Sequence, residues 1–443
     1  MRKKLLIKSS APAILGISLL LTICTNLRFT EFRIGLGEIL LLIVVLFGFF
    51  AAKDKLWAQN PVVWFLALFA VCASLGALIS DAIGGRVDWY IKAYAYTGGV
   101  SVGMAALMSG FANAQLRQTL WWLTISSAVL LWFGFSVYIS GNTEWAAALH
   151  MNSMYGDVRY SGWSENPNQL ALFFVPLPVW LAALWRDVRE PKSWQIVGFG
   201  VLLLSLMLMG LLVRSDGLFV VWVFEFVVLL GLRMRWDMKV SRLSLLSYAL
   251  SMVLCVLFVK TFAHGEVRKS FHCAAQTLSQ GLNPWKERCY DAQSFEDQEA
   301  FRIGYSDPVA KTGLREQLWR NGLTSWKESP WFGHGPGNFS WEPMPNVQSQ
   351  SQVPLDLKQE SHNMTIEFIV QGGILPGLAW VALIGYLLAI AWRAKDSYSF
   401  SVVLMMAVFT SFHVTRQPYL WFALIMSYEA IKRRLFSSGL AEG

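Results

Sequence analysis

One polar stretch of the chain gathers residue types that could carry out chemistry. Arg315 stands four residues before Trp319, and Ser361-His362-Asn363 stands directly before a long apolar run. An imidazole can take up a proton near neutral pH, because its unperturbed pKa is about 6.5. A guanidinium binds phosphate oxygens in pairs and keeps its charge. This stretch is therefore a candidate for chemistry at the mouth of a transmembrane helix.

The composition indicates a protein with many membrane spans. Of 443 residues, 55% are hydrophobic and 15% are charged, whereas soluble domains carry about 25% charged residues. Apolar runs of about 20 residues recur, and that length crosses the hydrocarbon core as a helix. The net charge is +8, but the basic residues gather at alternate ends of the apolar runs, as the positive-inside rule expects. We therefore expect contact with membrane lipids and no nucleic-acid binding.

We predict an all-α polytopic membrane protein with its N- and C-termini in the cytoplasm. If each apolar run crosses once, basic clusters such as Lys53/Lys55, Arg117 and Lys432-Arg433-Arg434 fall on the cytoplasmic side. Tryptophans near span ends, Trp421 among them, are expected at the membrane interface. About 12 transmembrane helices are predicted by span length, over residues 11–27, 34–52, 62–80, 93–109, 119–139, 169–185, 194–213, 216–232, 243–263, 364–391, 398–413 and 418–431.

The chain divides at its longest outer connection. Residues 1–263 hold the first nine spans, residues 264–363 form a mostly helical periplasmic loop domain, and residues 364–443 hold three spans and a cytoplasmic tail. A shorter outer connection covers residues 140–168. Apolar residues at three-to-four spacing predict a helix over residues 310–328 in the loop.

Two further features of the outer side follow from local composition. The glycine-rich residues 333–337 predict a turn, which His334 would help to shape. The run 364–391 would be about 42 Å long as a helix, which exceeds the roughly 30 Å hydrocarbon core. We therefore expect it to tilt, protrude or bend near Gly372-Gly373 and Pro376.

Cysteines and one acidic residue are interpreted by their surroundings. Cys24, Cys72 and Cys255 lie in predicted spans and are expected to be small apolar fillers. Cys273 and Cys289 lie in the loop domain, where the sequence leaves a disulfide and free thiols equally open. Glu225 lies inside a span and should face protein or a cavity.

Four motifs, all on the predicted outer side, occur in a specific order. The first is Arg159-Tyr-Ser-Gly162 followed by Asn166-Pro-Asn168-Gln-Leu-Ala, and the second is Val213-Arg214-Ser215. The third is Arg315-x-x-x-Trp319 leading to Pro330-Trp-Phe-Gly333-His-Gly335-Pro-Gly337-Asn-Phe339. The fourth is Ser361-His362-Asn363 followed by Glu367-Phe-Ile-Val-Gln-Gly372-Gly373-Ile-Leu-Pro-Gly377.

These motifs, with the chain length and the placement of the long loop, resemble the O-antigen ligase / polysaccharide polymerase family of bacterial inner-membrane glycosyltransferases. The resemblance implies a GT-C-like membrane enzyme with its site facing the periplasm, and a donor glycan linked to undecaprenyl diphosphate. The acceptor is lipid A-core in ligases and a second lipid-linked glycan in polymerases; related enzymes transfer glycans to protein. We favour a ligase, with a polymerase as the close alternative and a protein O-oligosaccharyltransferase less favoured.

The resemblance implies roles for particular residues. His362 is the candidate general base that takes the proton from the acceptor hydroxyl in an inverting displacement; the alternative is an interfacial histidine at a helix start. Asn363 is expected to cap the following helix. Arg315 is the first candidate for binding the diphosphate; the alternative is a solvated charge on a helix face.

Two more arginines are candidate diphosphate ligands. Arg214 could instead mark the end of a span, and the neighbouring Asp216 would partly neutralise it. Arg159 could instead form a salt bridge with Asp157 or Glu165.

We expect neither a metal ion nor another cofactor, because the chain contains no Asp-x-Asp motif and arginines already supply positive charge at the site. His413 is interpreted as structural. A lipid-linked glycan flippase or transporter remains a rival, but it would need polar residues along a path through the membrane. Here the polar motifs gather on one side.

Overall fold

The structure is a computed structural model of the chain. The described residues are 2–29, 34–51, 55–79, 85–139, 143–149, 151, 160, 162–164, 167–185, 192–213, 215–236, 242–262, 314–336, 361–414 and 417–437. Most of the predicted loop domain, including Cys273 and Cys289, lies outside them. The domain division therefore stays a prediction.

The described chain is all-α apart from one small ladder, and the predicted fold class is confirmed. Strands β1 (Arg28–Phe29) and β2 (Ile34–Gly35) pair antiparallel over two residues each. Short helices η1 (Thr25–Leu27), η2 (Lys55–Gln59) and α6 (Thr143–Ala148) lie in connections, and α14 (Leu314–Glu328) occupies the helix predicted in the loop.

Each predicted span contains a helix or a pair of helices. Within the described residues, six segments are long and apolar enough to cross a membrane, with residues 167–185 counted as one segment, and four more apolar helices are shorter. In chain order the helices are α1 (Arg2–Leu21), α2 (Leu36–Ala51), α3 (Pro61–Ile79), α4 (Gly85–Ser109), α5 (Asn113–Ile139), α7 (Pro167–Phe174), α8 (Leu177–Trp185), α9 (Ser193–Leu212), α10 (Asp216–Trp236), α11 (Arg242–Phe262), α15 (Met364–Gly372), α16 (Ile374–Arg393), α17 (Ser397–Thr410) and α18 (Pro418–Ser437).

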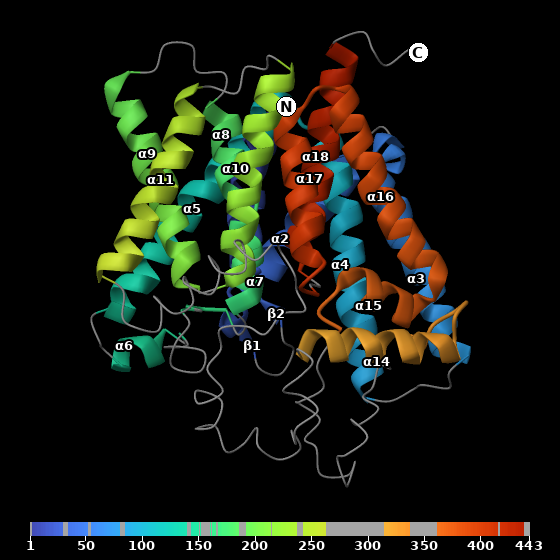
Figure 1. Cartoon of the computed structure of the whole chain (residues 1–443). Coiled ribbons are helices and arrows are strands. Elements are labelled where there is room, and N and C mark those ends of the chain that lie inside the picture. Colours follow the sequence, from blue (N-terminus) through green and yellow to red (C-terminus); the bar gives the residue numbers. More distant parts are fainter. Residues whose placement is uncertain are drawn as a thin grey trace.

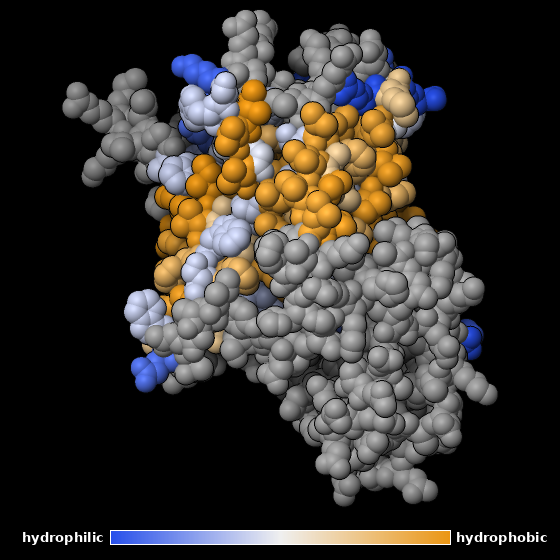
Figure 2. Space-filling view, turned by 60° about the vertical axis from the view of Figure 1, so that its left-hand side comes forward, coloured by the Kyte–Doolittle hydropathy of each residue, from blue (hydrophilic) through white to orange (hydrophobic). Residues whose placement is uncertain are grey.

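The long helices stand side by side as a bundle, and α14 and α15 lie across one end of it (Figure 1). On the face seen in Figure 2, apolar side chains form a broad band across the bundle, and hydrophilic side chains lie beyond its upper edge. A band of this kind matches the hydrocarbon core of a bilayer, where exposed apolar side chains are stable. The protein is therefore a multi-pass membrane protein, as its composition indicated.

The predicted span 169–185 is broken in its middle, which the sequence analysis did not foresee. Pro176 has no backbone N–H to continue the helical ladder between α7 and α8. The carbonyls left near the break are occupied from other helices: the Tyr419 hydroxyl donates to Phe173 O at 2.8 Å, and Trp222 Nε1 donates to Phe174 O at 3.2 Å. Such replacement partners are required inside a membrane, because water is absent there.

Of the tilt, protrusion or bend expected for the run 364–391, the structure shows a bend at Gly372-Gly373. Gly373, with φ +82°, separates α15 from α16, and a Cβ at this position would collide with the Trp331 carbonyl. Only glycine adopts this backbone conformation without strain. The break turns α15 across the bundle end, so α15 packs against both α14 and α3.

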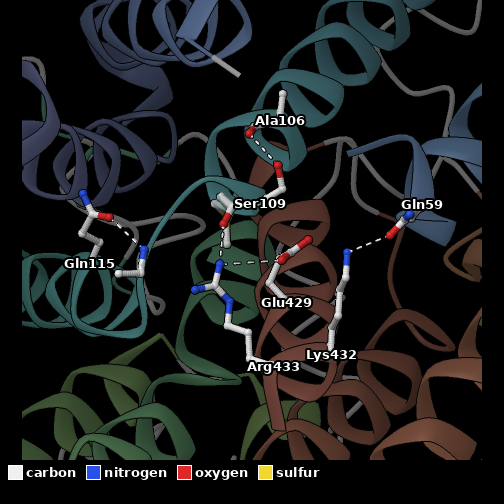
Figure 3. Close-up of polar contacts among 9 residues, drawn as sticks. Gln59, Ala106, Ser109, Gln115, Glu429, Lys432 and Arg433 are labelled. Carbon is white, nitrogen blue, oxygen red and sulfur yellow. Dashed lines mark hydrogen bonds and ion pairs between the residues drawn. The ribbon is translucent and has the colours of Figure 1, made fainter. Parts of the chain in front are cut away.

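The opposite end of the bundle holds basic residues from several helices. Arg433 donates to Met108 O at 2.9 Å and lies 3.8 Å from Glu429, while Lys432 donates to Gln59 Oε1 at 3.0 Å (Figure 3). Arg117 donates to Leu184 O at 3.0 Å. The span ends that the alternating topology assigned to one side therefore meet in space.

The cysteines and the glutamate that the sequence places inside predicted spans are buried among the helices. Cys24, Cys72 and Cys255 are buried, as expected for apolar fillers. Glu225 is fully buried and accepts a hydrogen bond from the Tyr248 hydroxyl at 2.6 Å, so it faces protein as predicted. The interfacial expectation for Trp421 is wrong: it is 3% exposed and packs on Phe65, because neighbouring helices cover its side of α18.

Candidate active site

The connection between α17 and α18, residues 411–417, is the point where the four sequence motifs converge. Residues 411–414 and 417 of this connection are described. It lies at the same end of the bundle as α14 and α15. It contacts segments of the first, third and fourth motifs and lies beside Gly217, two residues after the second motif.

His362 is held at the start of α15 in an unusual backbone conformation. Its φ is +52°, one of two positive values among the described residues other than glycine. Asn363 caps α15 as predicted, because its Oδ1 accepts from the N–H groups of Thr365 and Ile366. Asn363 Nδ2 also donates to Ser411 O at 3.0 Å. The half-buried imidazole is therefore carried on a turn that is fixed both to its own helix and to the α17–α18 connection.

A second imidazole lies beside the first. The ring centroids of His362 and His413 are 6.3 Å apart with an interplanar angle of 71°. His413 is 5% exposed and stacks on Phe409 of α17, with the ring centroids 4.5 Å apart. Packing on Phe409, one helical turn earlier, thus holds the His413 ring in place near His362.

The third motif reaches this place through α14. Arg315 lies in the first turn of α14, and its side chain is outside the described residues. Trp319 follows one turn later on the same helix face, and its ring centroid lies 6.3 Å from that of Phe412. Because Phe412 lies between Ser411 and His413, the start of α14 is brought to the turn that carries His362.

The glycine-rich turn anchors the other end of α14. His334 N donates to Val370 O at 2.8 Å and Gly335 N donates to Gln371 O at 2.9 Å. Gly333 and Gly335 have positive φ, and a Cβ at Gly335 would lie 2.5 Å from Ala77 Cα on α3. His334 Nε2 lies 2.7 Å from Ser325 O. These contacts confirm the predicted turn and fit the turn-shaping role given to His334.

The second motif lies on the other side of His413. A Cβ on Gly217 would be 3.6 Å from His413 Nε2 and 3.9 Å from Ser215 Oγ, so these groups share one small space. Arg214 lies outside the described residues, but its neighbours Val213 and Ser215 are both described and buried. The start of α10 therefore borders the site.

The first motif is joined to the second and to the α17–α18 connection. Tyr160 N donates to Leu212 O at 3.1 Å, which sets the backbone beside Arg159 against the end of α9. Gln169 of α7 accepts a hydrogen bond from Gln417 Nε2 at 3.2 Å. Arg159 itself lies outside the described residues.

Sequence reasoning missed the central position of His413. From the sequence, His413 was interpreted as a structural residue near a helix end. Alternation of the spans could have identified it, since the predicted span 398–413 ends on the same side as His362. In the described part of the chain, no group of three or more His, Cys, Asp and Glu side chains could hold a metal ion.

Comparison with known proteins covers part of the chain. Residues 199–381 match the family model described as O-antigen ligase. A stretch of 97 residues is 29% identical to an O-antigen ligase of Pseudomonas aeruginosa, and this stretch spans about a fifth of each protein, 21% of this chain and 22% of the relative. The region matched by the family model contains His362, Arg315 and Arg214, but not Arg159. Over these residues the chain is similar to the O-antigen ligase family, and this similarity agrees with the order of the motifs and with their convergence.

Proposed function

We propose that this protein is an O-antigen ligase, which transfers a glycan from undecaprenyl diphosphate to lipid A-core at the periplasmic face of the bacterial inner membrane. The observation that carries this proposal is the convergence of segments from all four motifs around residues 411–417. The segments lie far apart in sequence, and helix packing brings them to one end of the bundle.

The chemistry assigned to His362 is general base catalysis without a metal ion. The acceptor hydroxyl gives its proton to the imidazole while its oxygen attacks the anomeric carbon of the donor glycan. The bond from that carbon to the diphosphate oxygen breaks, and its electron pair leaves with the diphosphate. A single displacement inverts the configuration. General base catalysis of this kind typically contributes about 10²- to 10⁴-fold to the rate.

The arginines are assigned to the leaving group. Arg315, Arg214 and Arg159 would bind the diphosphate oxygens and stabilise the charge that grows as the bond breaks. Support comes from their neighbours: Trp319, Ser215 and Tyr160 are placed by contacts that lead to the same end of the bundle.

The orientation is proposed from the two bundle ends. Basic residues gather at the end opposite His362, as in Figure 3, and the cytoplasmic side of membrane proteins carries the excess of Lys and Arg. We therefore place the site on the periplasmic side and both termini in the cytoplasm.

The test uses purified protein, a defined undecaprenyl-diphosphate glycan, and two acceptors offered together: lipid A-core and a second lipid-linked glycan. A product on lipid A-core supports the ligase, whereas an elongated lipid-linked glycan would show a polymerase. His362→Ala should leave the protein folded and reduce transfer by at least about 10²-fold. Transfer at the normal rate in this variant would remove His362 as the base.

A further inference from the structure

We infer that Glu367 is the positioning residue for His362. This inference rests on the proposed function, and it explains how a histidine is kept in a left-handed backbone conformation. A φ of +52° is unfavourable for a side chain larger than glycine. Such a conformation persists only where surrounding contacts hold it.

Glu367 supplies those contacts from inside α15. It is 2% exposed, and its Oε2 accepts hydrogen bonds from Ser361 Oγ at 2.9 Å and from Ser361 N at 3.3 Å. Its Oε1 accepts from Gln371 Nε2, one helical turn further along. Both carboxylate oxygens are thus used, and one of them pulls Ser361 back over the first turns of the helix.

The effect on His362 follows from its neighbours. Ser361 is hydrogen-bonded to Glu367, and the Asn363 side chain is hydrogen-bonded to Ser411 O and to the N–H groups of the first turn. With both flanking residues fixed, the backbone of His362 has little freedom to leave its left-handed conformation. Glu367 thereby sets where the imidazole stands, although no contact between Glu367 and the reacting atoms is needed.

The role requires an acceptor oxygen rather than a charge. Gln371 Oε1 is buried and accepts no hydrogen bond within the described residues. If Glu367 becomes Gln, its carbonyl oxygen can keep both bonds from Ser361. Rotation of the Gln371 amide then presents Oε1 to the new NH₂ group. Glu367→Gln should therefore preserve the turn, whereas Glu367→Leu removes the acceptor while keeping a side chain of similar size.

The experiment measures kcat and KM for both substrates in the purified full-length protein. We expect Glu367→Leu to lower kcat by about 10- to 100-fold, the cost of misplacing a catalytic group by about 1 Å, with KM unchanged. Glu367→Gln should stay within about 3-fold of the wild type, because hydrogen-bond acceptance is retained. The matched control is Glu225→Leu, the same substitution at another buried glutamate, which should leave kcat unchanged.

A second, smaller substitution tests the same contact in case Glu367→Leu does not fold. Ser361→Ala removes the hydroxyl that donates to Glu367, and it should lower kcat in the same direction with KM unchanged. Adding it to Glu367→Leu should cost less than the product of the two single losses, since both substitutions remove the Ser361–Glu367 contact, although Ser361→Ala also removes the hydroxyl contacts with the Asn363 backbone. Wild-type kcat in both single variants, multiplicative losses in the double variant, or a Glu367→Gln loss as large as that of Glu367→Leu would each overturn the inference.

The outcome is separable from that of the proposed function. If His362→Ala is inactive while Glu367→Leu and Ser361→Ala behave as the wild type, His362 is still supported as the general base, and the positioning role of Glu367 is rejected. If His362→Ala is fully active, the proposed base itself is wrong, whatever the Glu367 variants show.

Discussion

The two ends of the helical bundle use polar residues in opposite ways. At the basic end, long side chains join one helix to another: Arg433 of α18 reaches the last turn of α4, and Arg434 lies 3.3 Å from Asp396 at the start of α17. At the other end, the described polar contacts around His362 hold one short turn in place, through Ser361, Asn363 and Ser411.

The difference lies in what each set of contacts determines. A guanidinium on a helix-terminal carbonyl stabilises the packing of two helices and tolerates small displacements, because its side chain is long. A left-handed residue between two fixed neighbours tolerates very little displacement. We therefore expect changes at the basic end to alter stability with little effect on turnover, and changes at the His362 end to alter turnover.

The largest effect is expected for Gly373→Ala. The new Cβ would collide with the Trp331 carbonyl, and φ +82° is strained for alanine, so the α14–α15 packing should lose about 3 kcal/mol or more. We expect a large loss of transfer activity together with a lower Tm in detergent. The control is Gly385→Ala on α16, where nothing lies within 4 Å of the added Cβ. Equal behaviour of the two variants would contradict this account of the bend.

A smaller loss is expected for Arg315→Lys. Lysine keeps the charge but loses the planar fork, so kcat/KM should fall by about 10- to 30-fold with no change in Tm. The control is Arg320→Lys on the same helix, at an exposed position, which should behave as the wild type. If the two variants cannot be told apart kinetically, Arg315 is a surface charge.

His413→Phe tests whether the second imidazole matters beyond packing. Phenylalanine can keep the stack on Phe409 but lacks the ring nitrogen near Gly217 and Ser215. We expect an approximately 5- to 10-fold lower kcat/KM with unchanged Tm, a loss equivalent to about one hydrogen bond. Unchanged kinetics would restore the purely structural interpretation.

The smallest effect on turnover is expected at the basic end. Arg433→Met keeps the apolar stem but removes the bond to Met108 O and leaves Glu429, which is 2% exposed, without its ionic partner. Stability should fall by about 1–2 kcal/mol, measured as a lower Tm, while kcat and KM stay unchanged. Loss of turnover at normal stability would erase the distinction between the two ends.

Several parts of this architecture could be predicted from the sequence, because they depend on interactions between residues that are close along the chain. The bend at Gly373 follows from adjacent glycines and a nearby proline, and the Asn363 cap follows from a short polar side chain before an apolar run. The burial of Trp421 was not accessible, because its surroundings come from α3, α15 and α16 rather than from its own helix.

The sequence by itself located the apolar helices and predicted their alternation across the membrane, since hydropathy and basic clusters act over single segments. It also supplied His362 and the arginine positions as candidates through their motifs. Only the tertiary structure decided that the turn after α17 joins these motifs, that His413 lies beside His362, and that Glu367 holds Ser361. The physical reason is that these contacts join residues whose neighbourhood is created by helix packing, and no local pattern records which helix ends meet.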